Sequence, residues 1–301
     1  MKILITGANG FIGSHLSESF GLASYIYRDC NTRHEVVCME REYKERNSDT
    51  PTFPHFFVDL TDNTELEHML KQLQPDVIFH CAAHANVTNS INNPEYDAQA
   101  NIIGTINLIT NAISVGVSKI IYSSSGSVYG EQQTALPMEE GHPIDPISPY
   151  GFSKWAGEQY LKLLKFPNYC VLRYSNVYGK NCRGVVKYFQ ECLENGISPV
   201  IYGTGDDTTR DYVHVSDVVS ANRFALRNDL QGVYNVSTGV PITLNELWKF
   251  FIETNGEHNN LPVIYKDLRD GECIENVLSS EKLQTEGWQW NKDMSVGTLR
   301  L

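Results

Sequence analysis

The chain opens with a strand, a glycine-rich turn and a helix in immediate succession. Residues 2–6 form a short apolar run that is typical of a buried strand, and residues 14–20 have the character of a helix. Between them, Gly7, Gly10 and Gly13 are spaced as GxxGxxG. A glycine turn between a strand and a helix is the context that a dinucleotide diphosphate requires. This order predicts a nucleotide-binding α/β fold.

Strands and helices alternate along the first part of the chain. Further apolar, strand-like runs occur at 36–39, 56–60, 75–80, 119–123 and 169–174. A long helix with apolar residues on more than one face is expected at 96–115. Alternation of this kind predicts a Rossmann-type, doubly wound parallel sheet, with ligands at the carboxyl ends of its strands.

The length of 301 residues suggests about two domains. Beyond residue 176 the regular alternation gives way to short strands and helices without a clean linker. We expect a dinucleotide-binding, Rossmann-type domain at 1–175, with 211–240 returning to it. A smaller, interleaved α/β substrate domain is expected at 176–210 and 241–301.

Composition excludes several classes of protein. The net charge of −12, without a run of Lys or Arg, argues against a nucleic-acid surface. No stretch of about 18 apolar residues predicts a membrane span, and no signal-peptide pattern is present. Seven cysteines, odd in number and without a CxxC pair, indicate reduced thiols. His80 and His84 lack a third ligand at usable spacing. We expect a cytoplasmic protein without a metal site.

The end of the second strand bears on the choice of cofactor. Glu40 stands where an acidic residue takes the ribose hydroxyls of NAD. Arg41, directly after it, is the alternative, because an arginine there holds the extra phosphate of NADP. A carboxylate repels that phosphate, so NAD is favoured. Asp59 ends the third strand as a plausible adenine contact, and the small residues 81–83 after the fourth strand allow a cofactor to approach the backbone.

A second feature begins at Ser148, which is a good N-cap and is followed by Pro149 at the first helical position. In that helix Tyr150 and Lys154 are four residues apart and share a face. Ionising a tyrosine at neutral pH needs roughly 4 kcal/mol, because its ordinary pKa is about 10. A nearby lysine and a bound cationic ring can supply that energy in a partly dry site. Taken alone, this spacing is far more typical of an ordinary amphipathic helix, because a Tyr and a Lys four residues apart are commonplace.

With these residues the chain resembles the extended short-chain dehydrogenase/reductase family, and within it the NAD-dependent nucleotide-sugar epimerases of the UDP-glucose 4-epimerase type. The resemblance covers nearly the whole chain. It rests on GANGFIG at 7–13, Asp59, HCAA at 80–83, Asn101 with Gly104 and Thr105, SSSGSVYG at 123–130, SPYGFSK at 148–154, LRYSNVYG at 172–179, RDYVHVSDV at 210–218 and RDGE at 269–272.

The resemblance implies roles for the matching positions. Ser125 would bind the substrate hydroxyl, Tyr150 would be the base, and Lys154 would hold the nicotinamide ribose and depress the pKa of Tyr150. Cofactor contacts are implied at Gly7, Gly10, Phe11, Ile12, Gly13, Glu40, Arg41, Asp59, Leu60, Cys81, Ala82, Ala83, Asn101, Ser123, Tyr150 and Lys154. Substrate contacts are implied at Ser125, Ser127, Asn176, Val186, Tyr202, Arg210, Arg269 and Glu272.

Within the second set, Asn176, Arg210 and Arg269 would bind the nucleotide diphosphate, since guanidinium groups offer forked donors to anionic oxygens. Glu272 matches a position that takes the nucleotide ribose, and Tyr202 one near the base, most often uracil. Structural salt bridges are the alternative for the two arginines.

Departures from relatives narrow the chemistry. The sugar 4,6-dehydratases carry Asp-Glu after the catalytic serine or threonine, where this chain has Gly126 and Ser127. Dehydration and decarboxylation therefore lack their acid and base. The sugar-gating position holds Asn276, so N-acetylated sugars stay possible. We expect C4 epimerisation of a UDP-hexose with NAD, by a homodimer paired through the helices at 96–115 and 155–164. The alternatives are an NAD(P)H-dependent 4-ketoreductase and a non-catalytic dinucleotide-binding scaffold.

Overall fold

The computed structural model describes residues 1–26, 34–42, 53–131, 137–255, 261–268 and 273–291. At its centre lies a seven-stranded sheet in the order β11-β6-β5-β4-β1-β2-β3, and every pairing in it is parallel. Its strands are β1 (Lys2–Thr6), β2 (Glu35–Glu40), β3 (His55–Phe57), β4 (Val77–His80), β5 (Lys119–Ser125), β6 (Tyr169–Tyr174) and β11 (Gly232–Val236). The predicted Rossmann-type, doubly wound fold is confirmed.

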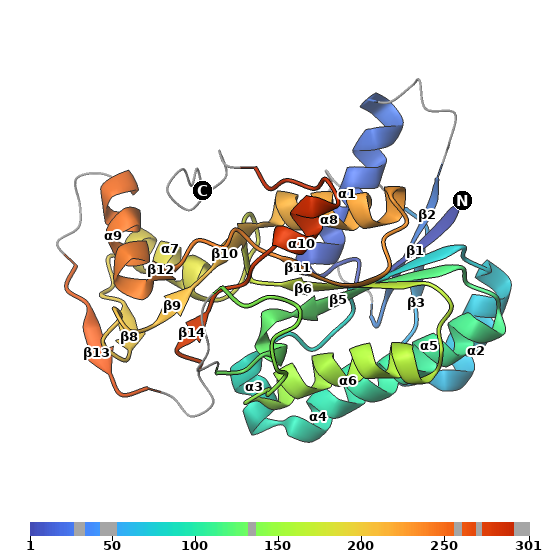
Figure 1. The fold of residues 1–301 in the computed structure, drawn as a ribbon, viewed down its shortest axis with the longest axis horizontal. Helices are drawn as coiled ribbons and strands as arrows, with labels where there is room; N and C mark the ends of the chain where they lie inside the picture. Colours follow the sequence, from blue (N-terminus) through green and yellow to red (C-terminus); the bar gives the residue numbers. More distant parts are fainter. Residues whose placement is uncertain (27–33, 43–52, 132–136, 256–260, 269–272, 292–301) are drawn as a thin grey trace.

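Helices cover both faces of this sheet (Figure 1). One face carries α1 (Phe11–Ile26), α8 (Val215–Arg227) and α10 (Glu281–Thr285), and the other carries α2 (Asn63–Leu73), α5 (Gly104–Ser114) and α6 (Pro149–Leu163). Strand β1 contributes side chains to the hydrophobic cores on both faces of the sheet. Ile3 and Ile5 belong to the first core and Leu4 to the second, because successive strand residues point to opposite faces. A parallel sheet buried on both sides therefore reads as a continuous apolar run.

The long helix expected at 96–115 is present as an unbroken helical run from Pro94 to Ser114 that contains a π-helical segment. After α3 (Val87–Asn92) come α4 (Pro94–Ala98), a π-helical segment (Gln99–Ile103) and then α5. Leu108 and Ile109 are buried against the sheet layer, whereas Ile103 and Ile113 are exposed. Apolar residues thus lie on an outward face as well as an inward one. No helix within the described ranges is long and apolar enough to cross a bilayer.

The remaining elements lie beside the large sheet, on the left of Figure 1. They are β7 (Asn176–Tyr178), α7 (Val185–Asn195), β8 (Val200–Tyr202), β9 (Thr209–Arg210), β10 (Tyr212–His214), β12 (Ile242–Thr243), α9 (Leu244–Asn255), β13 (Ile264–Lys266) and β14 (Glu275–Asn276). Helices α7 and α9 share a core in which Phe189 packs edge-on against Trp248, with ring centroids 5.2 Å apart. The division of the chain into two domains stays a prediction.

One predicted strand differs from the structure. The third strand ends at Phe57 rather than at residue 60, because Asp59 turns the chain by accepting hydrogen bonds from the N–H and hydroxyl of Thr61, at 2.9 and 2.8 Å. In the smaller part of the molecule, helix α9 starts at Leu244. Thr243 caps it in a reciprocal pair with Glu246, each side chain accepting the other's backbone N–H.

Helix α6 approaches β5 closely at Gly157. A Cβ atom there would lie 2.3 Å from the hydroxyl oxygen of Tyr122, a fully buried side chain. The same hydroxyl donates to the carbonyl of Lys154 at 3.3 Å. The helix therefore rests on the ring of Tyr122 and cannot accept a larger residue at that point without moving.

Gly157→Ala is expected to lower the free energy of unfolding by about 1–3 kcal/mol, because overpacking a closed contact outweighs the better helix propensity of alanine. The measurement is the midpoint of chemical denaturation. Gly141→Ala is the matched control, since nothing lies within 4 Å of a Cβ there. Equal midpoints for the two variants would contradict a close contact between α6 and β5.

Candidate active site

The glycine turn packs on the end of strand β4. Gly7 has φ +67°, and a Cβ on it would lie 2.6 Å from the backbone nitrogen of Ala82. A Cβ on Gly13 would lie 2.1 Å from the carbonyl oxygen of Gly7. Side chains are thus excluded where β1 turns into α1, and the first turn of that helix, which begins at Phe11, presents backbone N–H groups. This cradle fits a dinucleotide diphosphate.

The end of β2 borders the same turn. The carboxylate of Glu40 accepts a hydrogen bond from the backbone N–H of Asn9 inside the turn. Arg41 instead donates to the hydroxyl of Tyr96 at 2.6 Å, and this bond raises the pKa of the guanidinium. The carboxylate of Glu40 therefore lies at the glycine turn, where it fits the ribose of NAD. The guanidinium of Arg41 is held instead by Tyr96 of α4.

The two histidines of this region are held by hydrogen bonds. His80 is buried with its ring nitrogens 2.8 Å from the hydroxyl of Thr6 and 3.0 Å from that of Thr105. Burial lowers its pKa to about 3. His84 contacts Asp97 at 3.0 Å, and its backbone N–H donates to the predicted cofactor residue Asn101 at 2.7 Å. Among the described residues no cluster of His, Cys, Asp or Glu could hold a metal ion.

Helix α6 begins as its sequence predicts, with Ser148 accepting the N–H of Gly151 at 3.1 Å and Pro149 as the first helical residue. Its first turn presses on the loop after β5, where a Cβ on Gly151 would lie 2.4 Å from the carbonyl oxygen of Ser127. Ser125 caps that loop by accepting the N–H of Ser127 at 3.1 Å. The end of β5 and the start of α6 are thus in direct contact.

The three predicted catalytic residues meet at this contact. The side chains of Tyr150 and Ser125 are in contact, and the hydroxyl of Ser125 donates to that of Ser127 at 3.1 Å. Lys154 lies one turn along α6 and is 3% exposed, with its ammonium group 4.6 Å from the ring centroid of Tyr122. The group lies at the carboxyl ends of the strands, where open α/β sheets bind their ligands.

Burial dominates the ionisation of this group. It raises the pKa of Tyr150 to about 12, although the hydrogen bond from Ser125 opposes the change. It lowers the pKa of Lys154 to about 8, against the attraction of Cys81, Glu158 and Asp97 for the charged form. The resemblance had implied that Lys154 depresses the pKa of Tyr150. In the protein alone the desolvation of the phenol is the larger effect, so the tyrosine stays neutral at pH 7.

The predicted substrate residues lie on several elements. Both the backbone N–H and the side-chain amide of Asn176 donate to the carbonyl of Asp211, at 2.9 and 3.2 Å. Arg210 donates to the carbonyls of Thr209 and Ile274 at 3.0 and 2.7 Å, and also to that of Cys273. These are backbone partners rather than the alternative, a salt bridge.

The other predicted substrate residues lie in a core, at the end of a strand or outside the described ranges. Val186 is 3% exposed and packs in the core shared by α7 and α9. Tyr202 ends β8 opposite Lys266 of β13. Arg269 and Glu272 lie outside the described residues, so their predicted contacts stay predictions.

Sequence reasoning did not find three buried acids that shape the site. Asp97 contacts Asn101 and His84, Glu158 is paired with Arg173, and Asp211 accepts from Thr238 and Gly239. Only Glu158 carried a sequence signal, since it follows Lys154 by four residues on the same helical face.

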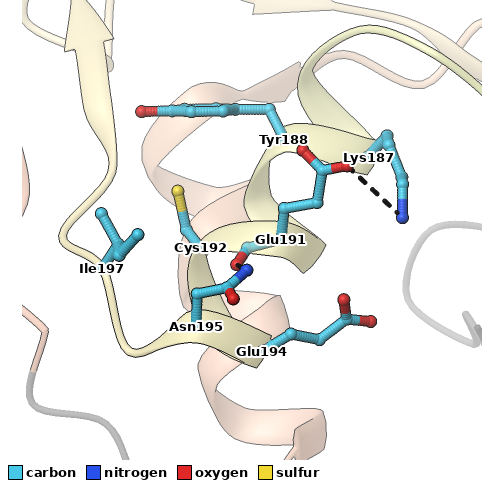
Figure 2. A pocket seen from close by; sticks show the side chains of 7 residues that line it. All are labelled: Lys187, Tyr188, Glu191, Cys192, Glu194, Asn195 and Ile197. Carbon is cyan, nitrogen blue, oxygen red and sulfur yellow. Dashed lines mark hydrogen bonds and ion pairs between the residues drawn. The ribbon is translucent and has the colours of Figure 1, made fainter.

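A surface hollow of about 430 Å³ lies along α7, away from these residues (Figure 2). It is lined by Lys187, Tyr188, Glu191, Cys192, Glu194, Asn195 and Ile197. Lys187 and Glu191 form an exposed ion pair of 3.6 Å within one helix. None of the predicted site residues lines it, so it does not belong to the candidate active site.

The ionisation of Lys154 predicts a pH dependence of stability. In the unfolded chain its ordinary pKa is 10.5, whereas in the folded protein it is about 8. The unfolded state therefore binds more protons between these values, and folding stability rises with pH there. Relative to Lys154→Met, the cofactor-free parent should gain roughly 3 kcal/mol from pH 8 to pH 10.5 in denaturant titrations. A constant difference would show that the lysine is hydrated.

Known proteins resemble this chain in sequence and in fold. The sequence matches the family described as "NAD dependent epimerase/dehydratase family" over residues 3–237. It is 36% identical over 312 residues to a UDP-glucose 4-epimerase of Mycolicibacterium smegmatis, covering 96% of this chain and 93% of that protein.

Two solved structures are similar over nearly their whole length. A UDP-glucose 4-epimerase of Thermotoga maritima with UDP-glucose has a TM-score of 0.86 and 32% identity, over 99% of this chain and 97% of that one. A UDP-glucose 4-epimerase of Thermus thermophilus in complex with NAD has a TM-score of 0.87 and 31% identity, with the same coverage. The glycine turn, the Ser125–Tyr150–Lys154 group and these likenesses agree, and the chain belongs to the NAD dependent epimerase/dehydratase family.

Proposed function

We propose that the protein is a NAD-dependent nucleotide-sugar epimerase that inverts C4 of a UDP-hexose through a transient 4-keto sugar. The observation that carries the proposal is the contact of Ser125 and Tyr150, with Lys154 one turn away, at the sheet edge that also bears the glycine turn. The named relatives, which are UDP-glucose 4-epimerases, support the reaction and the uridine nucleotide.

In this proposal each catalytic residue has one task. Ser125 holds the 4-hydroxyl of the sugar, and Tyr150 takes its proton and later returns it. Lys154 holds the nicotinamide ribose through its ammonium group. NAD held at the glycine turn would supply the acceptor for the C4 hydride and the donor that returns it to the opposite face of the sugar, and its cationic ring would favour the phenolate.

The distal polar residues anchor the nucleotide while the keto sugar turns over. Arg210 and Arg269 are proposed to bind the diphosphate, together with Asn176. A fixed diphosphate lets the sugar rotate about its bond to the nucleotide without leaving the site. The cofactor is restored in each turnover, so it has no need to dissociate.

The loop after Ser125 supports epimerisation over dehydration. Gly126 and Ser127 offer neither the acid nor the base that dehydration needs. A Cβ on Gly126 would also lie 2.9 Å from Asn276 and 3.0 Å from Leu278, so a larger acidic side chain does not fit there. A 4-ketoreductase would use the same three residues, but Arg41, the feature in its favour, is engaged by Tyr96.

We also propose a homodimer and a cytoplasmic location. Exposed apolar side chains gather on the outer side of the helical layer at Ile103, Ile113, Phe152 and Leu163, as an interface requires. The six described cysteines are free thiols, as in a reducing compartment. The two-domain division given above, with the nucleotide-sugar bound by the second domain, belongs to the same proposal.

Tyr150→Phe should retain bound NAD and lose about 10²–10⁴-fold in kcat, because the phenyl ring keeps the packing and removes the base. The assay is interconversion across a panel of UDP-, dTDP-, GDP- and CDP-hexoses, with mass spectrometry of the cofactor that copurifies. No isomerisation by the parent on any sugar would exclude the proposal. Stoichiometric release of NADP in each turnover would indicate the ketoreductase, and an equal absence of any turnover in parent and variant, with NAD still bound, would indicate a scaffold.

Light scattering at micromolar concentration should give twice the mass of one chain. Leu163→Asp, on the exposed face of α6, should give a monomer, because a charge at an apolar interface is strongly unfavourable. Ile197→Asp is the matched control, since Ile197 is an exposed apolar residue beyond α7. A monomeric parent would contradict the proposed dimer.

A further inference from the structure

One buried carboxylate joins three elements that carry or adjoin the catalytic residues. Glu158 lies on α6 with its side chain 3% exposed. Its Oε1 accepts a hydrogen bond from the hydroxyl of Ser124 at 2.5 Å and from Nε of Arg173 at 3.0 Å, and its Oε2 accepts from Nη2 of Arg173 at 2.6 Å. The carboxylate is thus fully engaged, by a forked guanidinium and a hydroxyl.

The strand register explains why these groups meet. Ser124 of β5 is directly opposite Arg173 of β6 in the parallel pairing, so both side chains lie on one face of the sheet. Helix α6 covers that face and brings Glu158 over them. Ser125 is the next residue after Ser124, and Lys154 lies one turn before Glu158. The hydrogen bonds that join Glu158 to Ser124 and Arg173 form a clamp, and this clamp fixes the end of β5 relative to the helix that carries Tyr150.

The network also holds the far end of the loop that Ser125 opens. Nη1 of Arg173 donates to the hydroxyl of Tyr129 at 2.8 Å, and its Cζ lies 4.9 Å from that ring's centroid. The hydroxyl of Tyr129 donates in turn to Asn235 of β11 at 2.8 Å. Residues before and after the turn at Gly126–Val128 are thereby tied to the same buried ion pair.

We propose that Glu158, paired with Arg173, is a positioning residue for the reaction: it holds both ends of the Ser125 loop against the helix that carries Tyr150. The kinetic part of this inference rests on the proposed function, whereas its electrostatic part does not. A buried ion pair that served stability alone would leave the reacting geometry and the charge on Lys154 unaffected.

The electrostatic part follows from the groups around Lys154. They are His80 and Cys81 at the end of β4, Asp97 on α4, Tyr122 on β5, and Tyr150 and Glu158 on its own helix. Burial lowers the pKa of Lys154, and the negative charge of Glu158 raises it again. Removing the charge of Glu158 takes away an attraction that favours the lysine cation, and it leaves the cation of Arg173 without its partner. Both effects favour the neutral form of Lys154.

The kinetic test removes the hydrogen bond between Ser124 of β5 and Glu158, and it keeps the ion pair between Glu158 and Arg173. Ser124→Ala should lower kcat about ten-fold, with the KM for the UDP-sugar and the NAD content within about two-fold of the parent, since small misplacements act on the chemical step. Ser17→Ala is the control, because Ser17 is also buried and its hydroxyl donates to the carbonyl of Ser14, at 2.8 Å. Equal kcat for the two variants would overturn the positioning role.

The second test measures the charge on Lys154 in the purified protein with its NAD. Lysines labelled with ¹³C at the ε-carbon are titrated by NMR, and the Lys154 signal is assigned by its absence in Lys154→Met. Glu158→Gln should lower the pKa of Lys154 by about half a unit or more. Glu67→Gln, which breaks an exposed ion pair with Lys71, should leave it unchanged. An unchanged pKa in Glu158→Gln would overturn the inference.

The two hypotheses fail in different ways. A wrong function appears as a parent that turns over no nucleotide sugar, and the NMR comparison still decides the role of Glu158. An active parent whose Ser124→Ala variant keeps full kcat refutes the positioning role and leaves the epimerase intact.

Discussion

Helix α6 can lie close to strand β5 because Gly157 leaves room for the ring of Tyr122. The charge of Lys154 above that ring, the bond between Ser125 and Tyr150, and the clamp formed by Glu158 all depend on this separation. A helix displaced by the width of a methyl group would loosen them together. Gly157, which has no side chain, is therefore the residue that allows the proposed catalytic geometry.

Desolvation sets the resting state of the predicted catalytic residues. It acts in opposite directions on a phenol and an amine, raising the pKa of Tyr150 and lowering that of Lys154, so it favours the neutral form of both. A phenol with a pKa of about 12 holds its proton in the protein alone. Within the proposed mechanism, the positive ring of NAD reverses this balance, which couples the activation of the base to the presence of the cofactor.

Local signals made much of the fold predictable. Ser148 and Pro149 marked the start of α6, and the run at 169–174 has the bounds of β6. The parallel sheet followed from the alternation of strands and helices. The π-helical segment at Gln99–Ile103 was not predictable, since its sequence also suits a regular helix.

The site was predictable only in part, for a related reason. Residues whose predicted role depends on one turn or one helix, such as Gly7 or Tyr150, can be proposed from local spacing alone. The pairing of Glu158 with Arg173 depends on the register of β5 against β6 and on which face α6 covers, and neither can be read from neighbours in the chain. The burial of Val186 in a core likewise depends on how α7 packs on α9.

The buried His80 gives the molecule a sensitivity to acid. Its ring joins Thr6 of β1 to Thr105 of α5, at the seam where the order of the parallel sheet reverses. The folded protein keeps this ring neutral until pH is near 3, whereas an unfolded chain takes up the proton at its ordinary pKa of 6.5. Each step of acidification between these values therefore draws the equilibrium toward the unfolded chain. The boundary between β1 and β4, next to the glycine turn, is therefore also a place where protonation of His80 destabilises the folded protein.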